Sequence, residues 1–280
     1  MLEGYMIVNA TRNNLPQVGL LVHSIKKVDA SRPIVVTTFD PELTNIQGIT
    51  DLIRIEGDIK NTVLQYFKSL VETPFEKTIA FLPDQILTAF NVDVWEPLRG
   101  MGPIVIPEKK ISFSGDRIWP SAYWQDSAEE KTFGYSSVIN AIYLNQNMGA
   151  KDIIGIAIDI CSSYDQTEFL HWIKKKADSG DTTALPVFPE FLWEQWIVSL
   201  LRMVLEDKIR VFDFVNCIDL SIQENNFWNP IWSKEPWSKF LTYWVTETSQ
   251  IKIENFVQHG LIKYQHAGWL SDDNLKMLKK

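Results

Sequence analysis

The stretch Tyr5–Phe39, YMIVNATRNNLPQVGLLVHSIKKVDASRPIVVTTF, decides the fold. Its two ends, 5–10 and 34–39, are short apolar runs rich in β-branched or bulky residues, as in buried strands. Between them, Pro16 suits the first turn of a helix. Apolar residues then recur at helical spacing, at Leu20, Leu21, Ile25 and Val28. The stretch therefore predicts two parallel strands joined by a right-handed helical crossover.

The same alternation continues along the chain. The expected elements are a short helix opening at Asp40-Pro41-Glu42, a strand at 51–55, a helix at 60–72 and a strand at 77–82. This order predicts an α/β fold with a Rossmann-like mixed sheet, mostly parallel and flanked by helices. Because such sheets bind ligands at the carboxyl ends of their strands, we expect the chemistry directly after Val8, Phe39 and Leu82.

The second half is less regular. It predicts a strand at 104–106, a long connection at 109–132, a helix at 138–148, a strand or buried helical turn at 153–158, helices at 166–177 and 190–206, and a strand at 208–214. Residues 216–280 hold five of the 11 tryptophans and are expected to be helical with loops. Since no clean linker is visible, we expect a main domain over 1–215 with the Trp-rich extension 216–280 packed on it.

Composition excludes several classes of protein. The 280 residues are 45% hydrophobic, which is too apolar for a disordered chain. A formal net charge of −8 argues against a nonspecific binder of nucleic acid or anionic membrane. No apolar run is long enough for a membrane span, and Met1–Ala10 has no basic segment of a secretory leader. With only Cys161 and Cys217, we expect reduced thiols in a cytoplasmic protein.

Four stretches carry a resemblance to a known family. They are Asn14-Leu15-Pro16 followed by 21–25 (LVHSI), 75–93 (FEKTIAFLPDQILTAFNVD), 208–216 (KIRVFDFVN) and 262–268 (IKYQHAG). They resemble the GT-A fold of nucleotide-sugar-dependent glycosyltransferases, and within it the glycogenin and galactosyltransferase-like group. The resemblance implies transfer of a sugar from a nucleotide-sugar donor, expected to be a UDP-sugar, to an acceptor hydroxyl. The domain 1–215 would then bind the donor.

The resemblance also implies a divalent metal site, but the sequence departs from the family there. Family members end the fourth strand in Asp-x-Asp, and such paired carboxylates suit Mn²⁺ or Mg²⁺, which neutralises the leaving diphosphate. This chain has Pro83, Asp84 and Gln85 instead. The implied ligands are Asp84, Gln85 and the late His266. An alignment shifted by one residue would make Asp84 a true counterpart of a family aspartate.

Three interpretations of this departure remain open. The metal binds weakly through those three residues. Alternatively, the enzyme needs no metal, and basic side chains such as Arg12, Arg117 and Lys263 neutralise the diphosphate. In the third, catalysis has been lost.

The resemblance assigns further site residues. Asn9, Ala10 and Thr11 end the first strand, where family members hold the base and ribose, and Asn14 follows them. An ordinary strand-to-helix turn, with Asn14 as a helix cap, is the competing interpretation. Glu190 opens a predicted helix where similar proteins place an acid near the acceptor or reacting sugar. Asp84 and Glu190 are therefore the predicted catalytic residues, although Glu190 also suits a simple partner of the helix dipole.

Other functions stay open at this point. A non-catalytic GT-A-like module would bind a nucleotide, a glycan or a protein partner, and the missing Asp pair favours it. A nucleotidyltransferase would share the sheet, but no glycine-rich basic loop follows Ala10. A DNA-modifying enzyme gains no support from the negative net charge.

Overall fold

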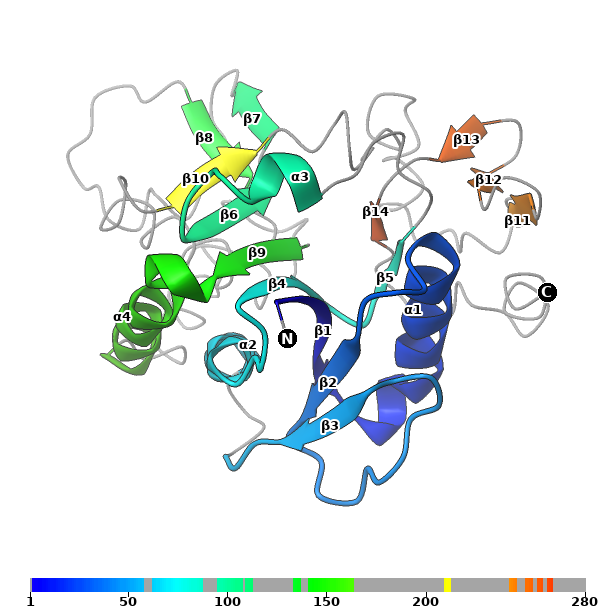
Figure 1. Cartoon of the computed structure of the whole chain (residues 1–280), viewed down its shortest axis with the longest axis horizontal. Coiled ribbons are helices and arrows are strands. Elements are labelled where there is room, and N and C mark those ends of the chain that lie inside the picture. Colours follow the sequence, from blue (N-terminus) through cyan, green and yellow to red (C-terminus); the bar gives the residue numbers. More distant parts are fainter. Residues whose placement is uncertain are drawn as a thin grey trace, which may run out of the picture.

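A seven-stranded sheet forms the centre of the protein (Figure 1). The computed structural model describes residues 2–57, 62–87, 95–107, 109–112, 133–136, 141–163, 209–212, 242–245, 250–253, 256–258 and 261–263. The strand order is β10-β6-β9-β4-β1-β2-β3. The strands are β1 (Glu3–Ala10), β2 (Ile34–Thr38), β3 (Asp51–Arg54), β4 (Lys77–Phe81), β6 (Ile104–Pro107), β9 (Ala141–Asn145) and β10 (Ile209–Phe212). Neighbours pair in parallel except at β9, which runs antiparallel to both β4 and β6. The predicted α/β class, with a mixed sheet flanked by helices, is confirmed.

Helices cover both faces of the sheet. β1 lies in its interior and sends Met6 and Val8 to one face, Tyr5 and Ile7 to the other. This two-sided burial explains why its sequence is a continuous apolar run. On the first face lie α2 (Thr62–Val71) and α4 (Ala150–Ser163), which also pack against each other (Figure 1).

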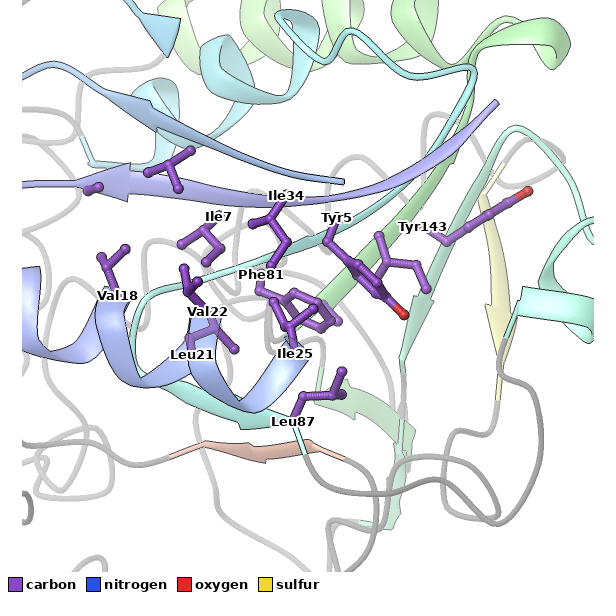
Figure 2. Packing of buried hydrophobic residues seen from close by; sticks show 14 of the residues in the cluster. Tyr5, Ile7, Val18, Leu21, Val22, Ile25, Ile34, Phe81, Leu87 and Tyr143 are labelled. Atoms are coloured by element: carbon purple, nitrogen blue, oxygen red, sulfur yellow. The ribbon is translucent and has the colours of Figure 1, made fainter. Parts of the chain in front are cut away.

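The second face packs against α1 (Leu15–Val28) and α3 (Trp95–Leu98). Figure 2 shows the α1 side chains pointing at the strands, with Leu87 of β5 (Gln85–Leu87) beside them. The buried α1 residues include Val18, Leu21, Val22 and Ile25, which share one side of the helix. The two faces together make a three-layer α/β/α sandwich.

The prediction of a helix at 138–148 is wrong. Residues 141–145 form β9, and the 3₁₀-helix η3 (Gln146–Met148) follows. All of β9 is buried, because strands flank it on both edges and helices cover both faces. A strand buried in this way is apolar throughout, so its sequence shows no period that separates it from a helix. The alternative at 153–158 is resolved as helix, within α4.

The short helix predicted to open at Asp40 is also wrong. One Asp40 carboxylate oxygen accepts from the backbone N–H of Glu42 at 3.0 Å, and the other accepts from Arg12. These bonds fix a turn, and the chain then continues without helix to β3 while burying Leu43 and Ile46 against the α1 side of the core.

The C-terminal part contains strands where helices were expected. β11 (Thr242–Val245), β12 (Gln250–Ile253) and β13 (Phe256–Gln258) form an antiparallel sheet, and β14 (Leu261–Lys263) pairs with β5. The long connection expected at 109–132 begins with β7 (Lys109–Ser112), which pairs with β8 (Phe133–Ser136). The helices predicted at 166–177 and 190–206 and most of the Trp-rich extension lie outside the described residues. Within the described part, no helix is long and apolar enough to cross a membrane.

Candidate functional site

A cavity of about 340 Å³ opens where β1, β2 and β4 end. Its walls come from the segments expected to carry the chemistry, namely those following Val8, at Phe39 and at Leu82. The described lining residues are Asn9, Ala10, Thr11, Asn14, Gln17, Phe39, Gln65, Leu82, Pro83 and Asp84. This volume lies at the lower end of the range for small-molecule sites. We call this cavity the strand-end pocket.

The strand-end pocket is built around a distortion of β1 at Asn9. Ile7 pairs with Val36 and Ala10 with Thr38, so β1 holds one residue more than β2 between these pairs. Such a bulge bends a strand and re-aims its side chains. Asn9 has φ 58°, the one left-handed non-glycine backbone in the described residues. Asparagine tolerates this conformation better than most residues, but the conformation persists only where its surroundings enforce it.

Hydrogen bonds with Thr37, Asn14 and Ser69 help to hold Asn9 in place. Its backbone N–H donates to Thr37 Oγ1 at 3.3 Å, and its carbonyl accepts from Asn14 Nδ2 at 3.0 Å. Its side-chain oxygen accepts from Ser69 Oγ, on α2, at 3.1 Å. The strained residue is thus tied to β2, to the turn after β1 and to a helix on the far side of the sheet.

Side chains also form hydrogen bonds with the backbone groups of the turn after Asn9. Thr38 Oγ1 donates to the Ala10 carbonyl at 2.7 Å, and the Thr11 N–H donates to Asn14 Oδ1 at 2.7 Å. Thr11 and Asn14 form a reciprocal capping box around the 3₁₀-helix η1 (Arg12–Asn14). Since these groups already have partners, a ligand in the pocket meets mainly side chains here. Asn14 stands at the N-cap position of α1, but its side chain makes no cap bond to that helix and bonds back to Thr11 and Asn9 instead, so the predicted cap is wrong. Asn14 also lines the pocket.

Arg12 pairs with two carboxylates at the rim of this turn. Its Nε lies 3.0 Å from Asp40 Oδ2, and Nη1 bonds Glu42. Hydrogen bonds from the backbone N–H groups of Arg12 and Glu42, and then from the Arg12 side chain, lower the pKa of Asp40 and favour its ionised form. A role for Arg12 in neutralising a diphosphate would require the guanidinium to leave these partners.

Asp84 is the single charged residue among the described lining of the pocket. Its neighbour Gln85 is fully buried in β5, and Gln85 Oε1 accepts from the Leu82 N–H at 3.0 Å. That bond closes the turn between β4 and β5 and holds Asp84 at the pocket. In the part of the chain that the structure describes, no three His, Cys, Asp or Glu side chains gather to hold a metal ion. One carboxylate and several amides do not by themselves complete a divalent cation shell.

Two amides that line the pocket were not predicted from the sequence. Gln17 comes from α1 and Gln65 from α2, so helices on opposite faces of the sheet both reach the site. Gln65 is 5% exposed, although it lies two residues from both Val63 and Phe67 and therefore on the opposite side of α2 from that core pair. The helical pattern placed Gln65 on the polar side of α2, so it gave no signal that this residue is buried at the pocket.

The remaining predicted residues are placed only in part. Lys263, in β14, pairs with Gln85, so the segment that leads to His266 reaches the residue after Asp84. His266, Glu190 and Arg117 lie outside the described residues. The structure thus brings Asn9, Ala10, Thr11, Asn14 and Asp84 together in one cavity and leaves the roles of all the predicted residues as predictions.

The chain resembles several solved glycosyltransferase structures, at low sequence identity. No family model matches the chain, and no curated protein matches its sequence. Among solved structures, it is similar to the apo form of the glycosyltransferase GlyE from Streptococcus pneumoniae TIGR4, with 11% identity and a TM-score of 0.42. It is also similar to the galactosyltransferase LgtC in complex with donor and acceptor sugar analogs, with 9% identity and a TM-score of 0.44. The bifunctional glycosyltransferase WbbM is similar at 10% identity, with a TM-score of 0.37.

The extent of overlap differs among these structures. The match covers 98% of this chain and 95% of LgtC, but only 57% of this chain and 34% of WbbM. It covers 76% of this chain and 45% of GlyE, so this chain spans less than half of GlyE. The TM-scores of 0.37–0.44 are low, and the strand order and pairing of the chain itself establish its α/β class.

Proposed function

We propose that this chain is a glycosyltransferase of the GT-A type, which binds a nucleotide-sugar donor in the strand-end pocket. The observation that carries this proposal is the meeting of three strand ends of a mostly parallel sheet around one cavity, whose described lining includes four amide side chains and Asp84. In sheets of this kind the carboxyl ends of the strands are the usual ligand position. The sequence motifs that resemble the family supply Asn14 and residues 82–84 of this lining.

The chemistry of the lining suits the uncharged part of a nucleotide. Asn9, Asn14, Gln17 and Gln65 bring amides to the pocket, and Phe39 adds an aromatic ring. Amides offer both donors and acceptors, which match the edge of a base and the hydroxyls of a ribose. The ring gives a flat apolar surface. We therefore assign the base and ribose of the donor to this end.

We assign Asp84 to the reacting end of the donor. A carboxylate there can accept hydrogen bonds from sugar hydroxyls, or it can serve as one ligand of Mn²⁺ or Mg²⁺. A metal role would draw on His266 and Gln85 as well, and Glu190 remains the predicted acid at the acceptor side. A UDP-sugar is the expected donor, and the acceptor class stays open.

A second function is favoured by one specific observation. At the position of the family's second aspartate, Gln85 is buried and bonded to the backbone of Leu82. A non-catalytic module that binds a nucleotide, glycan or protein partner would keep the fold and pocket while lacking that carboxylate. The two functions differ in turnover, because both include binding.

Thermal unfolding against a panel of UDP-, GDP-, CMP- and dTDP-sugars, each with Mn²⁺ or EDTA, tests the proposal. A ligand at about 100 times its Kd stabilises the native state by about 2.7 kcal/mol. In a chain of this length that raises the Tm by roughly 5–10 °C. A shift with one donor, followed by release of its nucleotide on incubation, supports the transferase. A shift without turnover supports the module, and no shift with any donor overturns donor binding.

A further inference from the structure

We propose that Ser69 is a positioning residue for the strand-end pocket, acting through Asn9. This inference rests on the proposed nucleotide binding and assigns part of its affinity to a residue that does not line the pocket. Ser69 lies on α2 and is fully buried. Its hydroxyl donates to the side-chain oxygen of Asn9 at 3.1 Å.

The hydrogen bond from Ser69 holds a residue whose backbone conformation is strained. Asn9 sits in the left-handed region at φ 58°, in the bulge of β1. A non-glycine residue pays a conformational cost there, so its surroundings must hold it. The bonds from Thr37 and Asn14 fix the Asn9 backbone, whereas Ser69 fixes its side chain. Together these bonds help to hold the amide of Asn9 at the wall of the pocket.

Loss of the Ser69 hydroxyl would remove one of the bonds that hold the side chain of Asn9 and leave its oxygen without this buried donor. The bulge would then populate other conformations, and the binding-competent fraction would fall. Apparent affinity falls in proportion to that fraction. Ser69 thus acts on binding without touching the ligand, and its effect must pass through Asn9.

The chain offers a matched control. Ser24 is also a fully buried helical serine, on α1. Its hydroxyl donates to the Leu21 carbonyl at 2.8 Å and accepts from the Leu87 N–H at 3.0 Å. Ser24→Ala removes the same group from the same kind of environment, away from the described lining of the pocket. A general loss of stability would affect both variants alike.

The experiment measures the Kd for UDP by titration calorimetry, with GDP, CMP and dTDP as further probes. We expect Ser69→Ala to raise the Kd roughly tenfold, and Ser24→Ala to change it by less than about twofold. In an Asn9→Gly background, where glycine adopts the left-handed conformation at little cost, Ser69→Ala should add less than about twofold. If Ser69→Ala does not fold, Ser69→Cys, with its weaker donor, should raise the Kd in the same direction.

The experiment distinguishes a failure of the proposed nucleotide binding from a failure of the role proposed for Ser69. Wild-type protein that binds none of the four nucleotides overturns the proposed function, and this inference with it. Wild-type protein that binds UDP while Ser69→Ala binds it equally well overturns the positioning role alone. The same holds if Ser24→Ala loses as much affinity, or if Ser69→Ala loses as much in the Asn9→Gly background as in the wild type.

Discussion

Gly4→Ala is expected to destabilise the protein through a single clash in the core. Gly4 is buried in β1, where it pairs with Thr78 of β4. A β-carbon added to Gly4 would lie 2.5 Å from two ring carbons of Phe75 and 2.7 Å from a third. Phe75 is itself only 3% exposed, so its ring has little room to move. Overpacking of this kind costs about 1–3 kcal/mol, and three close ring atoms place this case near 2–3 kcal/mol.

The assay is urea unfolding followed by far-UV circular dichroism, together with the Tm. A loss of about 2–3 kcal/mol should lower the Tm by roughly 5–10 °C. Gly19→Ala is the matched control, because a β-carbon there meets nothing within 4 Å and Gly19 lies inside α1. Alanine should stabilise this helix by up to about 1 kcal/mol. The reasoning is refuted if Gly4→Ala unfolds at the wild-type urea concentration, or if both variants lose stability equally.

Three further outcomes are expected. Asp84→Ala should abolish turnover of the nucleotide-sugar donor, while its circular dichroism spectrum stays that of the wild type. As a control, Asp159→Ala, which changes an exposed carboxylate, should keep wild-type rates. A folded Asp84→Ala variant that is still active would contradict the role assigned to Asp84. The hydrogen bond from Arg99 lowers the pKa of Glu3, against the opposing effect of burial. Ionised Glu3 therefore contributes to stability at a pH above 4.5, its ordinary pKa, and this contribution is lost as the pH falls below that value. Urea unfolding from pH 7 to pH 3 should therefore show a smaller acid loss in Glu3→Gln than in wild type, and equal slopes would contradict this. Burial raises the pKa of Cys161 to about 12, so iodoacetamide should leave this thiol unlabelled in the native protein and alkylate it in urea, as peptide mapping would show.

The apolar pattern within each segment was enough to predict the strands from β1 to β4. Each element from β1 to β4 has short β-branched or apolar runs or a helical stripe of its own, so its sequence and its environment agree. β9 could not be predicted in this way. It is enclosed by β4, β6 and helices on both faces, and its type was decided by neighbours far away in sequence. The turn at Asp40 failed for a related reason, since its geometry depends on Arg12, in the turn after another strand.

The position of the candidate site was predictable, but not its complete composition. The rule that ligands bind at strand ends pointed to the segments after Val8, Phe39 and Leu82. The family resemblance then named residues within them, and these lie at the pocket. Gln17 and Gln65 were missed because they reach the pocket from helices, and a helical glutamine is usually a surface residue. Ser69 was missed because its partner is Asn9, and no sequence pattern links these two positions.

The pairing of β5 with β14 has a consequence for the order of events during synthesis. β5 directly follows Asp84, whereas β14 emerges from the ribosome only after residue 260. At ~5–20 residues per second, the partner of β5 is delayed by roughly 10–35 s. During this interval the edge of β5 has no β14 beside it, next to the pocket. The pairing of β5 with β14, beside the strand-end pocket, therefore forms late in translation, long after Asp84 and the other described lining residues have been made.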